Sequence, residues 1–154
     1  MKFATNIVIF IVLNFGALAI GGMFTGNGVM SNWYAELNKA PWTPPGWVFG
    51  AAWTSIMICF TFFMTFAVKK VKRINLLIGL FAFQWILNVL WNPTFFYFQN
   101  ILMGLIVIIS LTILVTVILI QFWSELKLKS LFILPYLIWL IIATSLNAYI
   151  LINN

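Results

Sequence analysis

Charged side chains are scarce in this sequence of 154 residues, and histidine is missing. Only 6% of the residues are charged, whereas 64% are hydrophobic. A soluble domain usually carries about 25% charged residues, so this chain has too little polar surface to cover a globule in water. The composition excludes an ordinary soluble protein and indicates an integral membrane protein whose solvent is the lipid bilayer.

The sequence also lacks the side chains that build most metal and acid–base sites. Its one cysteine, Cys59, lies in an apolar run, cannot form an internal disulfide, and is expected to be an apolar filler. The usual zinc and haem ligand sets are absent. The only acids, Glu36 and Glu125, are predicted to lie in different loops on opposite sides of the membrane. The sequence therefore predicts no metal site, no required cofactor and no conventional acid–base pair.

Long apolar runs fill most of the chain. Backbone groups in a bilayer must be satisfied internally, which leaves helices or a closed barrel, and these runs lack the alternation of barrel strands. About 20 apolar residues cross a bilayer. We therefore predict an all-α fold, one integral membrane domain over residues 1–154, with five transmembrane helices at roughly 5–25, 46–68, 74–96, 102–122 and 131–151.

Basic residues are distributed unevenly over this five-span layout. Only Lys39 falls on one side of the membrane; the other side receives Lys2, Lys69, Lys70, Lys72, Arg73, Lys127 and Lys129. The positive-inside rule then predicts a cytoplasmic N-terminus, with loop 26–45 and the C-terminus extracytoplasmic. The net charge of +6 thus indicates topology and not nucleic-acid binding. The cluster at 69–73 could also bind anionic lipid head groups.

The segment from Trp33 to Trp53 is the one long stretch without a continuous apolar run, and it holds four of the eight tryptophans and three of the five prolines. Proline excludes a regular helix over residues 40–45, and the aromatic content is unlike that of a flexible linker. We predict an ordered loop that leads into a helix beginning near Pro45 or Gly46, with Thr43 as its N-cap.

Amides and indoles share one helical face in two of the predicted spans, at the spacing i, i+4, i+7 and i+8. In the third span these positions are Gln84, Asn88, Trp91 and Asn92. In the fifth they are Trp139, Ala143, Leu146 and Asn147. In the second span, Phe49 and Trp53 lie one turn apart below the loop. Because unpaired polar groups are costly inside a bilayer, we expect the three faces to converge on a pocket for a flat, largely apolar ligand.

These features have structural alternatives. Amides also join membrane helices by hydrogen bonds worth roughly 1 kcal/mol, and for Asn88 this alternative stays open. Gly21 and Gly22 can serve close helix packing or line a pocket. An interfacial belt or packing within the loop is favoured for Trp33, Tyr34, Trp42, Trp47 and Trp123. Tyr34 and Pro44 are nevertheless retained as candidate ligand contacts, because the loop lies over the predicted pocket.

Three segments carry a family resemblance: WYAELNKAPWTPPGWVFGAAWT at 33–54, QWILNVLWNPTFF at 84–96 and PYLIWLIIATSLNAYILINN at 135–154. They resemble the tryptophan-rich sensory protein, or translocator protein, family (TspO/MBR), also called the peripheral-type benzodiazepine receptor. The five-span layout fits the whole length. The match to bacterial members and the lack of a long C-terminal tail imply a bacterial homologue in the plasma membrane.

The resemblance implies a five-helix bundle whose first loop covers a pocket that binds porphyrins such as protoporphyrin IX, isoquinoline carboxamides and benzodiazepines. Homodimers are frequent in the family. By motif, the pocket-lining positions are Trp53, Asn88, Trp91, Trp139, Ala143 and Asn147. Trp53 and Trp139 match tryptophans implicated in porphyrin breakdown by bacterial members. In animal members, cholesterol binding is associated with an aromatic residue followed by a basic residue near the end of the fifth span. Here no Lys or Arg follows Tyr149, so the resemblance does not extend to sterol recognition by this segment.

We therefore expect a membrane receptor that holds a tetrapyrrole or a flat aromatic compound. The alternatives are a light- and oxygen-dependent porphyrin-degrading enzyme, with Trp53 and Trp139 as catalytic residues, and a transporter, although no span holds an ion-coupling carboxylate. The candidate ligand-binding residues are Trp53, Asn88, Trp91, Trp139, Ala143, Leu146, Asn147, Phe49, Gly22, Tyr34, Pro44 and Gln84.

Overall fold

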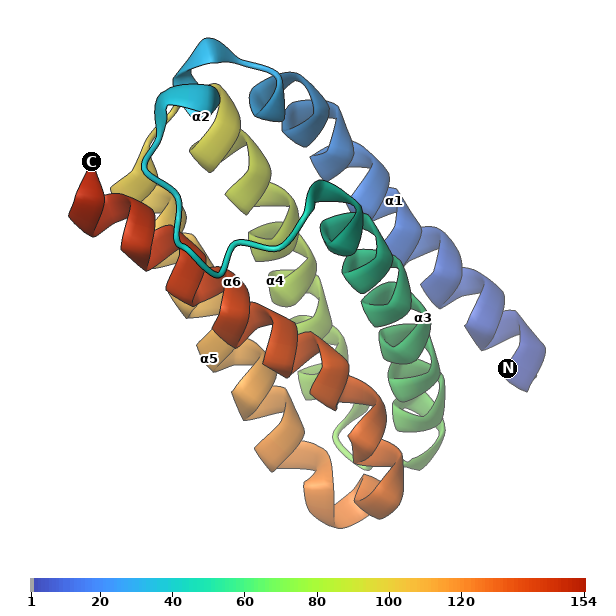
Figure 1. Cartoon of the computed structure of the whole chain (residues 1–154). Helices are drawn as coiled ribbons and strands as arrows, with labels where there is room; N and C mark the ends of the chain where they lie inside the picture. The colour runs from blue at the N-terminus through green and yellow to red at the C-terminus, as the bar shows by residue number, and fades with distance from the viewer. Residues whose placement is uncertain (1) are drawn as a thin grey trace.

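The computed structural model describes residues 2–154, and within them the fold is an all-α bundle without strands (Figure 1). The elements are α1 (Phe3–Val29), α2 (Asn32–Glu36), α3 (Gly46–Lys70), α4 (Ile74–Asn92), the π-helical turn η1 (Pro93–Tyr97), α5 (Ile101–Leu126), the 3₁₀ segment η2 (Lys127–Ile133) and α6 (Leu134–Asn153). All the α-helices except α2 are long, and this confirms the predicted fold class.

Four helical stretches in the described chain are long and apolar enough to cross a membrane, by length and composition. They are Phe3–Val29, Gly46–Lys70, Ile74–Tyr97 and Ile101–Asn153. The last stretch contains both α5 and α6, which run antiparallel on either side of η2 (Figure 1). Lys127 reverses the chain there with a φ of 50°, so this stretch folds as two neighbouring helices.

The ends of several elements differ from the predicted bounds. The helix α1 continues to Val29, and the short helix α2 occupies part of the predicted loop 26–45. Residues 131–133 belong to η2, so α6 begins at Leu134. The predicted N-cap at Thr43 is wrong: Pro45 is the N-cap of α3, with extended backbone and no side-chain cap. A proline at this position needs no donor, because the first helical turn leaves its N–H groups unpaired anyway.

Proline 93 explains why α4 changes to a π-helical turn. Proline has no N–H to donate to the preceding turn, and the N–H of Phe98 instead donates to the Pro93 carbonyl at 2.9 Å. Two side chains satisfy carbonyls of that turn: Asn92 Nδ2 donates to the Asn88 oxygen at 3.2 Å, and Thr94 Oγ1 donates to the Leu90 oxygen at 2.7 Å. The chain therefore remains helical through Tyr97 without the regular hydrogen-bond pattern.

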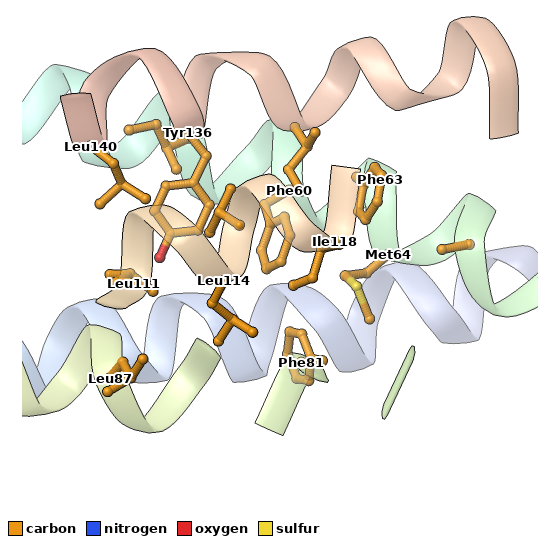
Figure 2. Packing of buried hydrophobic residues seen from close by; sticks show 14 of the residues in the cluster. Phe60, Phe63, Met64, Phe81, Leu87, Leu111, Leu114, Ile118, Tyr136 and Leu140 are labelled. Carbon is orange, nitrogen blue, oxygen red and sulfur yellow. The ribbon is translucent and has the colours of Figure 1, made fainter. Parts of the chain in front are cut away.

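A cluster of fully buried side chains lies where α3, α5 and α6 meet. The ring of Phe60 stacks on Phe63 and meets Tyr136 edge-on, with centroids 5.8 Å and 5.3 Å away. Figure 2 shows these rings among the aliphatic side chains of α5, and Phe60 and Tyr136 are at most 1% exposed. Dispersion contacts of this kind drive helix association where lipid surrounds the bundle.

Several charged residues gather at one end of the bundle. Lys69 Nζ lies over the Phe3 ring, and Lys129 Nζ lies over the Phe66 ring. The backbone N–H of Lys72 donates to Glu125 Oε2 at 2.8 Å. These contacts gather the N-terminal part of α1, the chain around 69–72 and the start of η2 at one end, here called the lysine-rich end. The loop between α2 and α3 crosses the other end (Figure 1), here called the loop end.

Candidate ligand cavity

A cavity of about 610 Å³ lies at the loop end between α1, α3, α4 and α6. This volume is within the range of about 300–1,000 Å³ that is typical of small-molecule sites. Its walls are mainly apolar and aromatic, with a few amides and hydroxyls. The residues that line it include Gly22, Tyr34, Lys39, Pro44, Phe49, Trp53, Asn88, Trp91, Phe95, Phe96, Trp139, Ala143, Leu146 and Asn147.

Aromatic rings from α3 and α6 form one wall of the cavity. Phe49 meets Trp139 edge-on with ring centroids 5.3 Å apart, and Trp53 meets Tyr136 edge-on at 5.9 Å. Edge-to-face pairs hold ring planes in defined orientations. Trp53 is half-buried and Trp139 is 7% exposed, so both indoles are packed into the bundle and still face the cavity.

The opposite wall is built by α4, η1 and a hydrogen-bonded amide of α6. Trp91 stacks on Phe95 with ring centroids 5.2 Å apart. Its indole Nε1 donates to Asn147 Oδ1 at 3.2 Å, and Asn147 Nδ2 donates to the carbonyl of Ile101 at 3.1 Å. Asn147 is therefore paired at both ends of its carboxamide and positions the Trp91 ring.

Asn88 is the amide in this cavity that stays available for a ligand. It is 7% exposed and lines the cavity. Within residues 2–154 its side chain has no hydrogen-bonding partner, although its backbone carbonyl accepts from Asn92. A carboxamide offers both a donor and an acceptor, so Asn88 can pair with either kind of polar atom.

Helix α1 supplies a wall of small side chains. An added Cβ on Gly21 would lie 2.5 Å from Asn92 Nδ2, so a side chain at this position would displace the Asn92 carboxamide. The Asn92 carboxamide accepts from Thr25 Oγ1 at 2.7 Å. Thr25 therefore holds the Asn92 carboxamide in place, and Gly21 leaves the room that it occupies. Neither residue places a large side chain in the cavity.

The loop and α2 close the cavity through aromatic contacts with η1. Trp33 packs on Phe95 and Tyr34 packs on Phe96, with ring centroids 5.5 Å and 5.6 Å apart. Burial raises the pKa of Tyr34 above that of an ordinary tyrosine, because the environment disfavours the phenolate. Tyr34 therefore faces the cavity as a neutral phenol.

Two sets of hydrogen bonds fasten the loop to α6. The backbone N–H of Asn38 donates to Asn154 Oδ1 at 2.8 Å, and Asn38 Nδ2 donates to the carbonyl of Asn153 at 3.0 Å. Farther along the loop, Trp42 Nε1 donates to Ser145 Oγ at 3.2 Å, and its ring meets Tyr149 edge-on. In Figure 1 the loop runs from α2 past α6 to α3, which gives it the position of a lid.

Eleven of the twelve candidate ligand-binding residues line this cavity. Gln84 does not: it lies one turn of α4 nearer the lysine-rich end, and its Nε2 donates to the hydroxyl of Tyr136 at 2.7 Å. Gln84 is 2% exposed, so this amide joins α4 to α6 inside the bundle instead of facing the cavity. Gln84 was predicted to contact the ligand because it lies on the same face of α4 as Asn88. The shared face does not show how far along the helix the cavity extends.

Sequence reasoning missed other lining residues, among them Ala17, Leu18, Thr25, Lys39, Thr43, Phe95 and Phe96, and it named Gly21 and Asn92 without retaining them as candidates. The α1 residues carried little signal, because small and aliphatic side chains are common on every membrane helix. Phe95 and Phe96 could have been found by continuing the α4 face by another turn from Asn88 and Asn92.

A second, more open hollow lies against Trp139, which also lines the main cavity. It is formed by Ala52, Ser55 and Ile56 of α3 and by Pro135, Ile138 and Trp139 of α6. Trp139 therefore separates the main cavity from a hollow between α3 and α6. Its indole nitrogen is buried and has no hydrogen-bonding partner within the described residues.

Comparison with known proteins assigns the chain to a family. The model of the TspO/MBR family matches residues 8–152. The chain belongs to the TspO/MBR family. It is 34% identical to the tryptophan-rich protein TspO of Archaeoglobus fulgidus, over 100% of this chain and 97% of that protein. It is 36% identical to the tryptophan-rich protein TspO of Chlorobaculum tepidum, over 79% of each chain.

A more distant TspO/MBR relative is the human translocator protein, which is 27% identical over 83% of this chain and 78% of that protein. Membership confirms the family resemblance found in the loop and in the third and fifth predicted spans. Together with the apolar helices, it makes this chain a multi-pass membrane protein.

Proposed function

We propose that this protein is a membrane receptor that binds a flat, largely apolar aromatic ligand in the cavity beneath the loop. Protoporphyrin IX or a related tetrapyrrole is the proposed natural class, and isoquinoline carboxamides and benzodiazepines are expected to compete for the site. The observation that supports this most is the arrangement of Trp53, Asn88 and Trp139 around one lidded cavity of about 610 Å³.

The chemistry of the walls suits such a ligand. Indole and phenyl faces offer large apolar contact areas with little rotational freedom to lose. The unpaired carboxamide of Asn88 supplies one directional contact, whereas the amide of Asn147 is already occupied by Trp91 and Ile101. A ligand with an extended ring system and few polar atoms therefore satisfies the cavity better than a sugar or a nucleotide.

The test is a titration of the purified protein with protoporphyrin IX and with an isoquinoline carboxamide. Tryptophan emission should be quenched saturably, and each ligand should displace the other. The double variant Trp53→Phe with Asn88→Ala should bind at least about tenfold more weakly, which corresponds to about 1.4 kcal/mol.

The matched control is Trp47→Phe with Asn75→Ala, which changes the same residue types at exposed positions outside the cavity lining. It should bind like the unmodified protein, and porphyrin absorbance provides a readout independent of the altered tryptophans. Unsaturable quenching, or equal affinities for both double variants, would refute the receptor proposal.

A second candidate function is light-dependent degradation of a bound porphyrin. It is favoured by Trp53 and Trp139, which both line the cavity, and by the unpaired indole nitrogen of Trp139. The porphyrin would be the substrate oxidised and dioxygen the oxidant, with an indole as the intermediate redox partner. Illumination with porphyrin in air should then give a defined product; an unchanged product and rate with Trp53→Phe and Trp139→Phe would exclude this function.

We also propose that the loop end faces the outside of a bacterial plasma membrane and that the lysine-rich end is cytoplasmic. The charge distribution supports this orientation. A cysteine introduced by Glu36→Cys should react with a membrane-impermeant maleimide in intact cells, whereas one introduced by Lys72→Cys should react only after permeabilisation. Both positions are exposed, so the opposite pattern would reverse the orientation.

A further inference from the structure

Lys39 is the one charged side chain among the described residues that line the cavity. It comes from the loop and is half-buried. Its ammonium lies 4.5 Å from the centre of the Tyr34 ring, and 3.4 Å from each of the carbonyl oxygens of Ala35 and Leu37. The cation is thus held over the mouth of an otherwise uncharged cavity.

The backbone around Lys39 is fixed on both sides. Asn38 is hydrogen-bonded to Asn153, the last residue of α6, and to Asn154, which follows it. Ala40 is 4% exposed, and its carbonyl accepts from the N–H of Thr43 at 2.9 Å. The position of this lysine is therefore determined by the lid, unlike that of a lysine on a freely moving loop.

No acid of the described chain pairs with this ammonium. The chain has only two acids, and Glu125 accepts from Lys72 at the lysine-rich end. Glu36 is exposed, and the polar contacts of Lys39 are to carbonyl oxygens alone. Long contacts with neutral oxygens and a ring satisfy a cation less well than a carboxylate does.

Two hydroxyls lie on the same side of the cavity. Tyr34 and Thr43 both line it from the lid, and within residues 2–154 neither hydroxyl forms a hydrogen bond. The lid therefore presents one cation and two neutral donors, while the deeper walls present rings and the Asn88 amide. The lid side of the cavity is therefore positive, and its other walls are mainly apolar and aromatic, with a few amides and hydroxyls.

We propose that Lys39 is an anion-binding residue and that the ligand is a flat aromatic acid. Its carboxylate lies against Lys39 at the mouth, and its ring system extends inward between Asn88 and the wall formed by Trp53 and Trp139. This inference rests on the proposed receptor function and narrows its ligand class. It predicts discrimination between an acid and its neutral ester, which a purely apolar cavity would not show.

The test compares protoporphyrin IX with its dimethyl ester, in neutral detergent and at low salt. The unmodified protein should bind the acid roughly tenfold more tightly than the ester, as expected for one charge-assisted contact at a partly buried site. Lys39→Met should weaken acid binding by a similar factor and leave the ester unchanged. Lys39→Arg should retain the preference, and Lys129→Met, which removes a lysine at the other end, should behave like the unmodified protein.

Other results overturn the inference in distinguishable ways. Equal affinities of the unmodified protein for acid and ester, or an equal loss of both with Lys39→Met, would leave the receptor function standing and assign Lys39 a structural role. Loss of the acid preference on adding phosphatidylglycerol would assign the lysine to a lipid phosphate instead. Failure of the unmodified protein to bind either porphyrin saturably would overturn the receptor function and this inference with it.

Discussion

Trp91 on α4 donates its indole N–H to the carboxamide of Asn147 on α6 at 3.2 Å. The other end of that carboxamide donates to the carbonyl of Ile101, the first residue of α5. One side chain thus ties three helices together at the cavity wall. Space for it is provided by Gly104, where an added Cβ would lie 3.2 Å from Asn147 Oδ1.

Asn147→Ala is expected to loosen this wall. The change leaves the Trp91 N–H without its partner and should destabilise the bundle by about 0.5–1.5 kcal/mol. Because the Trp91 ring is then less well positioned, ligand affinity should fall several-fold. Thermal unfolding in detergent and porphyrin titration measure the two effects. Asn75→Ala, at an exposed position on the same helix as Trp91, should change neither.

Trp42→Phe is expected to weaken the attachment of the lid. The substitution keeps an aromatic ring beside Tyr149 but removes the hydrogen bond to Ser145. A neutral hydrogen bond of this kind contributes about 0.5–1.5 kcal/mol, so ligand dissociation should accelerate by a few-fold in a stopped-flow displacement experiment. Ser145→Ala should reproduce the effect, because it removes the other partner.

The matched control for the lid is Trp47→Phe. Trp47 is 74% exposed and lies on the first turn of α3, beyond the residues that attach the loop to α6. Its dissociation rate should equal that of the unmodified protein. Equal rates for all three substitutions would show that ligand release does not depend on the contact between Trp42 and Ser145.

Gly28→Ala is expected to be strongly destabilising. An added Cβ would overlap the Cβ and ring of Phe96, which is 8% exposed. Overpacking of a buried site costs typically about 1–3 kcal/mol, and it would also displace the ring on which Tyr34 packs. Gly26→Ala is the control, because open space surrounds an added Cβ there. If the two variants melt at the same temperature in detergent, α1 does not approach Phe96 as closely as described.

Binding of an uncharged ligand is expected to be independent of pH between roughly pH 6 and 9. No histidine or acid lines the cavity among the described residues. Burial raises the pKa of Tyr34, so its neutral form is favoured in the folded protein, and any stability linked to it is lost only as the pH rises above the range of ordinary tyrosine. An isoquinoline carboxamide titration should therefore give one affinity across this range. A change near pH 7 would require a titrating group that this cavity does not present.

The sequence was sufficient to predict the helices and most of the polar cavity wall. In a bilayer every backbone N–H and C=O must be hydrogen-bonded within the protein, and long apolar runs can achieve this as helices. The spacing of Asn88 and Trp91, and of Trp139 and Asn147, placed each pair on one face because the helical period is regular. The same helical period led to the prediction that Gln84 lines the cavity, which it does not. A period gives the direction of a side chain around the helix axis but not its position along the axis relative to the cavity.

The path of the lid could not be derived in the same way. The contact between Asn38 and Asn154 joins residues 116 positions apart in the chain, and no local propensity encodes it. This contact fixes the backbone of the residue next to Lys39. Thr43 was predicted as an N-cap on residue type alone, but two prolines follow it, and the helix begins only after the second.

An experimental structure of the protein bound to protoporphyrin IX would test the receptor proposal most directly. The macrocycle is expected to lie between Trp53, Asn88 and Trp139, beneath a loop still attached to α6 through Asn38 and Trp42. A porphyrin bound instead on the lipid-facing surface, with the cavity free of it, would contradict the proposed receptor function.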